Sequence, residues 1–408
     1  MRILILSQVY WPDTASTAQH LSDLGAALVR RGHDVRVLCS RHGYEDPRRV
    51  YAQRETVAGV DVRRLRHTGL GKASVWRRLV DFSTFNLAML WRVVLTRRRS
   101  VDVVLGMTSP PLVSFLGSLV ARWKGWRFCY WAMDLQPELA IEAGMVRRGS
   151  LPATLLERMG WSVFRHAHRI VALDRFMADH ISRRGAAGEA ITVLPIWPVV
   201  DEPWQGRRLE NPFRTAQGFA DRVVVMYSGN HSVVHPLDTL LEAARLLRED
   251  ERFLFVFIGG GVRMRDVSGF KTAHGLENIV QLPYQPRSEI GKSLTAADLQ
   301  VVIMGDGQVG FTHPNKVYGA MWIGCPFVYI GPEPSHVTDL MHACPGNLSV
   351  RHGETEKLVE SLRAFAAAGP ECWREVGEGN RQYAHLRLNA PEVIAKMIAA
   401  VESAMSHA

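Results

Sequence analysis

The stretch Gly305–Pro326, GDGQVGFTHPNKVYGAMWIGCP, decides the fold that we predict for this chain. It follows an apolar strand, Leu299–Met304, and opens into a segment with apolar residues at helical spacing. Pro314 suits the first turn of that helix, because the N–H that proline lacks has no partner there. Lys316 adds an ammonium group to the positive end of the helix. This order of strand, turn and lysine-bearing helix indicates a phosphate site rather than an ordinary surface lysine.

Two further turns of this kind lie upstream. A buried strand at 223–228 runs into Gly229 and Asn230, and the strand Phe253–Ile258 ends in Gly259-Gly260-Gly261, followed by Arg263. Glycine permits positive φ and a close approach of the backbone to a ligand. Any one of these turns has an ordinary structural explanation. Three at the carboxyl ends of strands in one half of the chain predict a nucleotide site, because ligands of open parallel sheets bind there.

The bulk properties are typical of an intracellular enzyme. The chain has 408 residues, 47% hydrophobic and 22% charged, which is enough for two domains with large cores. Its five cysteines are scattered without CxxC or Cys/His pairing, so we expect reduced thiols, no metal site and no cofactor. The opening MRILILSQVY reads as a core strand that is too short for a secretory signal, so the expected location is the cytoplasm.

The positive charge is concentrated in the first half of the chain. Residues 1–200 hold 29 Lys/Arg against 16 Asp/Glu, whereas residues 201–408 hold 20 against 24. Residues 72–99 have an apolar, aromatic-rich middle between one arginine pair, Arg77-Arg78, and one arginine triplet, Arg97-Arg98-Arg99. This pattern is typical of a helix lying on an anionic membrane. A core helix with solvated ends is the alternative. We find no nucleic-acid-binding module in the sequence, and therefore predict a membrane surface rather than nucleic acid as the polyanionic partner.

Strands and helices alternate along the chain, and the alternation restarts at Val223. This predicts an α/β protein with two successive Rossmann-like domains that face each other across a cleft. The expected organisation is an N-terminal domain at 1–200, a linker at 201–222, a second domain at 223–370 and C-terminal helices of undetermined docking at 371–408.

Several segments together resemble family 4 glycosyltransferases of the GT-B fold, particularly those of exopolysaccharide and colanic-acid-type assembly. They are the N-terminal strand and loop, the DLWPE-type segment that reads DLQPE at 134–138, YSGNHSVVHPLDTLLEAARLL, IGGG, LPYQPRSEI and HPNKVYGAMWIGCPFVYIGPEPSHVTDL. The resemblance covers nearly the whole chain. It implies a retaining, metal-independent transfer of a hexose-type sugar from a UDP- or GDP-sugar to a saccharide or an undecaprenyl-diphosphate-linked acceptor. The enzyme would then work at the inner face of the cytoplasmic membrane.

The resemblance also implies roles for particular residues. The diphosphate of the donor would be bound by Gly229, Asn230 and Lys316, and its base by the loop of Gly259, Gly260, Gly261 and Arg263 together with Pro283 and Tyr284. Further donor-side candidates are His235, Pro314, Asn315, Ser335 and His336. The acceptor-side candidates are Thr14, Ser16 and Thr17.

Candidates for the chemistry itself lie in both halves of the chain. They are Lys316, which would stabilise the leaving diphosphate, Asp134 and Glu138, which could orient an acceptor hydroxyl, and His313. Asp134 could equally cap the helix that Pro137 begins, with Glu138 in its first turn. The histidines His231, His313 and His336 could equally be ordinary turn residues.

The sequence departs from the family pattern at two places. Many members carry two glutamates eight positions apart, where this chain has Phe311 and Gly319. Many also carry a Lys or Arg after the SGN-type turn, where the nearest residue here is His235, which we expect to be neutral or partly charged at pH 7. Two other functions therefore stay open: a nucleotide-sugar epimerase of the same fold, and a non-catalytic, membrane-associated assembly subunit.

Overall fold

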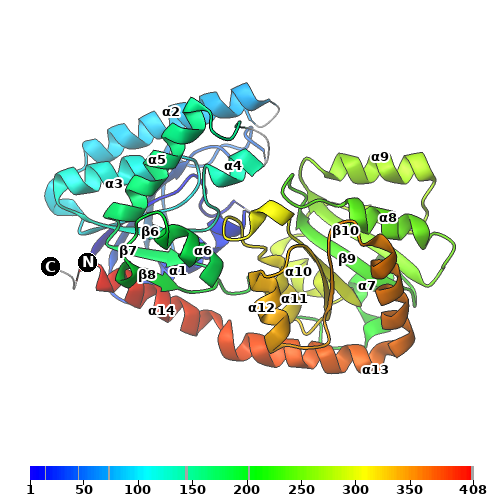
Figure 1. Ribbon diagram of the computed structural model, residues 1–408. Helices are drawn as coiled ribbons and strands as arrows, with labels where there is room; N and C mark the ends of the chain where they lie inside the picture. The colour runs from blue at the N-terminus through cyan, green and yellow to red at the C-terminus, as the bar shows by residue number, and fades with distance from the viewer. Residues whose placement is uncertain (14, 45, 72–73, 143–145, 201–202, 406–408) are drawn as a thin grey trace. The chain divides into compact units, whose positions relative to one another are not determined.

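The computed structural model describes residues 1–13, 15–44, 46–71, 74–142, 146–200 and 203–405 (Figure 1). The chain divides into two compact units. Unit 1 contains Met1–Trp197, Gly310–His313 and Ala390–Ala408, and unit 2 contains Pro198–Val309 and Pro314–Asn389. Within the described residues, no helix is both long enough and apolar enough to cross a membrane.

Unit 1 is built on an eight-stranded sheet with the order β3-β4-β2-β1-β5-β6-β7-β8. All neighbouring strands are parallel except β3, which runs antiparallel to β4. The central strands are continuous apolar runs, as expected for a parallel sheet covered on both faces. Their bounds are β1 Arg2–Leu6, β2 Asp34–Ser40, β3 Arg54–Val57, β4 Val60–Leu65, β5 Val103–Gly106, β6 Arg127–Trp131, β7 Arg169–Ala172 and β8 Ile191–Val193.

The helices of unit 1 cover both faces of this sheet. In the sheet, β2 lies on one side of β1, whereas β5, β6 and β7 follow on its other side. Right-handed crossovers therefore put α1 on one face of the sheet and α3 and α5 on the opposite face. The C-terminal α14 packs against α1 and β7, and α3 packs between α2 and α5 (Figure 1). The helices are α1 Ser16–Arg30, α2 Val75–Val94, η1 Arg98–Ser100, α3 Val113–Lys124, α4 Glu138–Glu142, α5 Leu151–His166, α6 Arg175–Ser182, η2 Gly188–Ala190 and α14 Ala390–Ser403.

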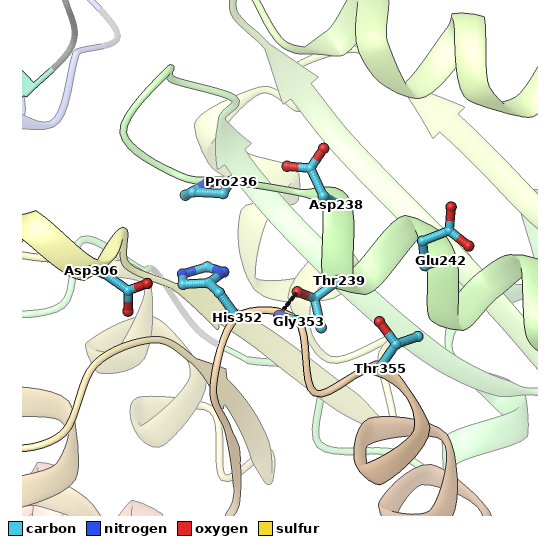
Figure 2. A pocket seen from close by; sticks show the side chains of 8 residues that line it. All are labelled: Pro236, Asp238, Thr239, Glu242, Asp306, His352, Gly353 and Thr355. Atoms are coloured by element: carbon cyan, nitrogen blue, oxygen red, sulfur yellow. Dashed lines mark hydrogen bonds between the residues drawn. The ribbon is translucent and has the colours of Figure 1, made fainter.

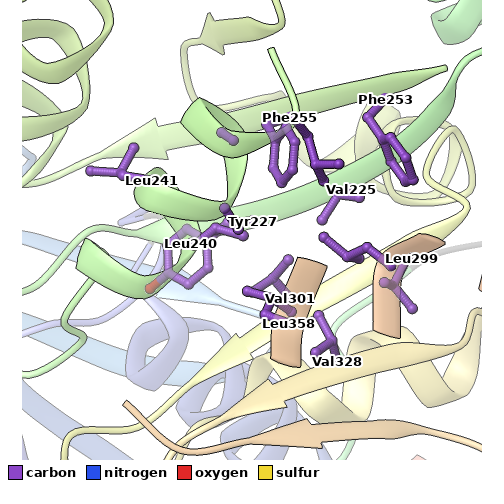
Figure 3. Packing of buried hydrophobic residues seen from close by; sticks show 14 of the residues in the cluster. Val225, Tyr227, Leu240, Leu241, Phe253, Phe255, Leu299, Val301, Val328 and Leu358 are labelled. Carbon is purple, nitrogen blue, oxygen red and sulfur yellow. The ribbon is translucent and has the colours of Figure 1, made fainter. Parts of the chain in front are cut away.

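Unit 2 has a six-stranded, fully parallel sheet with the order β11-β10-β9-β12-β13-β14. Alternate residues of β9 serve two cores. Val225 and Tyr227 pack with α8 and α13 on one face, whereas Val224 and Met226 pack with α7 and the end of α11 on the other (Figure 3). The strands are β9 Val223–Asn230, β10 Phe253–Gly260, β11 Ile279–Leu282, β12 Leu299–Ile303, β13 Phe327–Ile330 and β14 Leu348–Val350.

The helices of unit 2 follow its strands in alternation. Two of them are irregular. The helix α11 has only seven residues, and α13 changes direction at Gly369, where φ is +77°. The helices are η3 Arg208–Glu210, α7 Pro212–Ala216, α8 Asp238–Leu246, α9 Met264–His274, α10 Arg287–Leu294, η4 Asp306–Gln308, α11 Lys316–Trp322, α12 His336–Ala343 and α13 Thr355–Arg387.

The division of the chain differs from the predicted boundaries at both ends of unit 2. The expected linker at 201–222 contains η3 and α7, and its described residues belong to unit 2. A buried ion-pair network explains this: Arg214 and Arg208 both bond the carboxylate of Asp298, which also accepts the N–H of Val224 at 2.8 Å. The C-terminal segment expected at 371–408 is likewise divided, since α13 stays with unit 2 and α14 belongs to unit 1.

Candidate functional site

Three glycines bring the ends of β9 and β10 close together in unit 2. Gly229, Gly259 and Gly261 have φ of +124°, +128° and +118°. A Cβ on Gly259 would lie 2.1 Å from the carbonyl oxygen of Gly229, and one on Gly261 would lie 2.4 Å from Oδ1 of Asn230. No side chain fits at these positions without movement of the backbone. The turns predicted from the sequence therefore form one continuous glycine-lined edge of the sheet.

Lys316 lies against this edge. Its Nζ is 3.4 Å from the carbonyl oxygen of Asn230 and 4.8 Å from the centre of the Tyr227 ring, and a Cβ on Gly229 would come within 2.8 Å of its Cε. Burial among these groups lowers the pKa of Lys316 to about 8. The ammonium group is thus held above the glycine turn, where it can meet an anion that also reaches backbone N–H groups.

The helix contributes less to this site than the sequence suggested. α11 begins at Lys316, so Pro314 precedes its cap residue, Asn315, instead of occupying the first turn. A helix of seven residues sums few peptide dipoles. The charge of the Lys316 side chain is therefore the principal source of positive potential at this turn.

Two histidines beside Lys316 are neutral. Burial, reinforced by the Lys316 charge, lowers the pKa of His231 to about 4 and that of His235 well below its ordinary value. His231 is fully buried, with Nδ1 3.2 Å from the carbonyl oxygen of Gly260. Of the two states expected for His235 at pH 7, neutral or partly charged, its surroundings favour the neutral one, because they disfavour the imidazolium. His235 can offer a hydrogen bond but no charge in place of the family's Lys or Arg.

The predicted base-binding residues flank the same glycines. The ring of Tyr284 lies over Gly259 and Gly260, with atoms 3.2 and 2.9 Å from the Cβ positions of these glycines, and 44% of the residue is exposed. An exposed ring at this place can stack on a planar base. Arg263 bonds Asp266 at 2.9 Å and Asp238 at 3.5 Å, so two carboxylates fix its guanidinium. Pro283 directly precedes Tyr284 in the loop after β11.

A pocket of about 330 Å³ opens on the other side of α8 (Figure 2). The carboxylates of Asp238, Glu242 and Asp306 line it, with His352 and Gly353 from the loop after β14. One of its lining residues, Asp238, is the partner of Arg263. None of the predicted donor-side residues lines it. Exposed carboxylates repel a diphosphate, so this pocket is not the predicted nucleotide site.

Ser335 and His336 begin α12. Ser335 is fully buried, and it forms a reciprocal capping box with Thr338. His336 is also buried. The capping role accounts for the burial of Ser335 without a ligand.

Unit 1 gathers the other candidates for chemistry near the start of α6. Nδ1–H of His313 donates a 2.8 Å hydrogen bond to Oδ2 of Asp174. The other oxygen of this carboxylate accepts the Met177 N–H and caps α6. Asp134 is accessible to solvent, but surrounding protein atoms raise the pKa of its carboxyl to about 6 despite the nearby His313. The raised pKa brings the carboxyl group of Asp134 closer to titrating at neutral pH than that of an ordinary aspartate.

Glu138 belongs to a separate ion-pair group on α4. Burial opposes its ionisation, yet a 2.9 Å bond from His180 and the charges of His180 and Arg184 outweigh this effect and lower the pKa of Glu138. Phe311, at one of the two positions where many family members have glutamate, packs its ring edge-on against His180, with centroids 4.6 Å apart. Glu138 is thus committed to side chains of α6, which favours a structural role.

The acceptor-side prediction is only partly described. Thr14 lies outside the described residues, and Ser16 and Thr17 form the start of α1. The sequence analysis missed a pocket nearby in unit 1, lined among others by Ser40, His42, His67 and Asp81. His42 and His67 each come two residues after neighbouring strands, β2 and β4, so strand-end reasoning could have found them. Burial lowers the pKa of His67 to about 4, so this ring is neutral, and the guanidinium of Arg78 and the carboxyl group of Asp81 also line the pocket.

Comparisons with known proteins agree with the fold. The family described as "Glycosyl transferase 4-like domain" matches residues 17–197. WbjE of Pseudomonas aeruginosa, named as a glycosyltransferase, is 27% identical over 64% of this chain and 66% of that protein. WcaI of Escherichia coli K12, named as a glycosyl transferase of colanic acid biosynthesis, is 22% identical over 89% of this chain and 91% of that protein.

A solved structure shows the same fold. Alr3699/HepE of Anabaena, determined with UDP and glucose, aligns with 99% of this chain and 100% of its own at a TM-score of 0.73 and 13% identity. The predicted GT-B architecture of two Rossmann-like domains is confirmed. The predicted resemblance to family 4 glycosyltransferases is confirmed as well, since residues 17–197 match the glycosyl transferase 4-like domain.

Proposed function

We propose that this protein is a retaining glycosyltransferase of cell-surface polysaccharide assembly, which moves a hexose-type sugar from a UDP- or GDP-sugar without a metal. The observation that carries the proposal is the position of Lys316 over the glycine edge at Gly229. A leaving diphosphate develops negative charge, and a preorganised ammonium with backbone N–H groups stabilises it most in the transition state. The names of WbjE and WcaI support this class of reaction.

The acceptor that we propose is a lipid-linked saccharide, carried on undecaprenyl diphosphate and presented at the inner face of the cytoplasmic membrane. Unit 1 would bind it through Ser16, Thr17 and the pocket that His42 lines. Asp134, with its carboxyl pKa near 6, is the group proposed to orient the acceptor hydroxyl. No covalent role is assigned to it.

A panel of UDP-, GDP- and dTDP-sugars tests the proposal by thermal stabilisation and calorimetry. We expect one nucleotide class to bind and to stabilise the protein, and the anomeric configuration of the product, read by NMR, to match that of the donor. EDTA should leave turnover unchanged. No binding by any nucleotide would overturn the enzymatic assignment, and an inverted product would overturn the retaining mechanism.

A further inference from the structure

Three helices of unit 1 form one layer: α2, α3 and α5, with α3 packed between the other two (Figure 1). They cover the face of the sheet opposite to α1 and α14. Their inward sides supply core residues, for example Phe85 and Met89 of α2 and Phe164 of α5. Their outward sides carry no further element of unit 1 among the described residues.

The outward side of α2 is apolar as well. Trp76 and Trp91 are 73% and 67% exposed, and Leu87 lies between them at helical spacing. A helix of a soluble protein normally turns charged and polar residues outward. The core of unit 1 is complete without these side chains, so their exposure is not explained by folding.

The same composition continues across the neighbouring helices. Trp123 of α3 is 69% exposed, and Leu151 at the start of α5 is 87% exposed. We define the exposed apolar residues of the three helices as the aromatic face; they are Trp76, Leu79, Leu87, Trp91, Leu119, Trp123, Leu151 and Leu155. Because α3 packs against both α2 and α5, these residues belong to one layer of helices, and exposed apolar residues gathered in this way mark an interaction surface.

Basic residues outnumber acidic ones along α2, α3 and the segment that joins them. Residues 74–124 contain eight Lys/Arg and two Asp/Glu. Asp81 is buried and accepts the N–H groups of Leu70 and Gly71, and Asp102 pairs with Arg2. Neither carboxylate therefore cancels the field of the arginines, which include the exposed triplet Arg97, Arg98 and Arg99.

We propose that the aromatic face of α2, α3 and α5 lies flat on an anionic bilayer, with its tryptophans among the headgroups and its arginines on the lipid phosphates. Tryptophan prefers the membrane interface because its ring is apolar and its N–H is polar. The surplus of basic charge matches anionic lipid. The proposal rests on the proposed function. It extends the membrane contact predicted from the sequence of residues 72–99 to three helices, and it would place unit 1 where a lipid-linked acceptor is found.

Vesicle binding tests the proposal with three full-length variants. The first replaces Trp76, Trp91 and Trp123 by alanine; the second replaces Arg97, Arg98 and Arg99 by glutamine. The third is a matched control that replaces Arg265, Arg363 and Arg374, exposed arginines of unit 2, by glutamine. Binding is measured by cosedimentation with phosphatidylcholine vesicles that contain 0 or 30% phosphatidylglycerol, at low and high salt.

We expect the wild type and the control to bind only the anionic vesicles, and each of the other two variants to bind them at least tenfold more weakly. Salt should weaken the wild type more than the Arg97–Arg99 variant. UDP affinity, measured by calorimetry, should be the same in all four proteins, which separates a failure here from a failure of the enzymatic proposal. Equal binding by all four proteins, or a dimer in solution that the tryptophan variant dissociates, would overturn the proposal.

Discussion

The Nζ of Lys316 lies 4.8 Å from the centre of the Tyr227 ring and beside the carbonyl oxygen of Asn230. These two contacts orient the ammonium group before any ligand arrives. The aromatic face of Tyr227 attracts a cation but cannot neutralise it as a carboxylate would. The charge of Lys316 is therefore not cancelled and stays available to an anionic ligand.

Replacement of Lys316 by alanine should abolish sugar transfer and leave the fold intact. The side chain is only partly buried, so its loss costs little stability, whereas a preorganised charge on a leaving group contributes roughly 3 kcal/mol or more. Steady-state turnover and the thermal midpoint check both parts. Lys271→Ala in α9 is the matched control. Near-normal turnover in Lys316→Ala would remove the residue from the mechanism.

UDP affinity should depend on pH above about 8. In the free protein the pKa of Lys316 is lowered to about 8 by burial, and a bound diphosphate should raise it again. Affinity is then constant near pH 7 and falls as pH rises through 8, by at most about tenfold per pH unit, because binding takes up a proton. Calorimetry in two buffers of different ionisation enthalpy measures this proton. The same uptake in Lys316→Met would show that another group titrates.

Gly229→Val should weaken donor binding by more than tenfold. The position has φ +124°, and a Cβ there would displace Lys316 and cover the backbone that a phosphate approaches. Gly275→Val is the control, because that glycine also has positive φ but has no atom within 4 Å of its Cβ position. If calorimetry finds equal losses of affinity for both variants, the turn at Gly229 has only a structural role.

Asp298→Ala should destabilise unit 2 severely. The change leaves Arg214, which is 1% exposed, and the Val224 N–H without their shared acceptor, and breaking such a buried pair costs about 3–5 kcal/mol. Asp221→Ala removes a largely exposed partner of Arg208 and should cost less than about 1 kcal/mol. Urea unfolding compares the two. Equal midpoints would show that the network is not a source of stability.

The sequence was sufficient for five of the six strands of unit 2, because these strands are mostly apolar runs followed by glycine, proline or a polar turn. It was also sufficient to bring Gly229, Gly259 and Lys316 to one edge, since parallel strands end together. The short strand β3 was missed, because its residues Arg54–Val57 alternate in burial without a clear apolar pattern. The short β14 at Leu348–Val350 was missed as well.

Side-chain pairing could not be predicted in this way. The neutrality of His235 follows from burial beside Lys316, and the commitment of Glu138 follows from His180 and Arg184, which are 42 and 46 positions later in the chain. Residues 208–216 pack on unit 2 through ion pairs with Asp298, which lies far along the sequence. Such effects arise only when the fold brings distant groups into a shared environment of low dielectric.

The return of α14 to unit 1 has a consequence for how the protein is made. Val393, Met397 and Val401 of this helix are buried in a unit whose sheet is encoded by the first half of the chain. During synthesis from the N-terminus, unit 2 is therefore fully translated before the last helix of unit 1 leaves the ribosome. The domain that begins first is completed last, and a fragment that stops at Trp197 would leave the α1 side of its sheet uncovered at the place of α14.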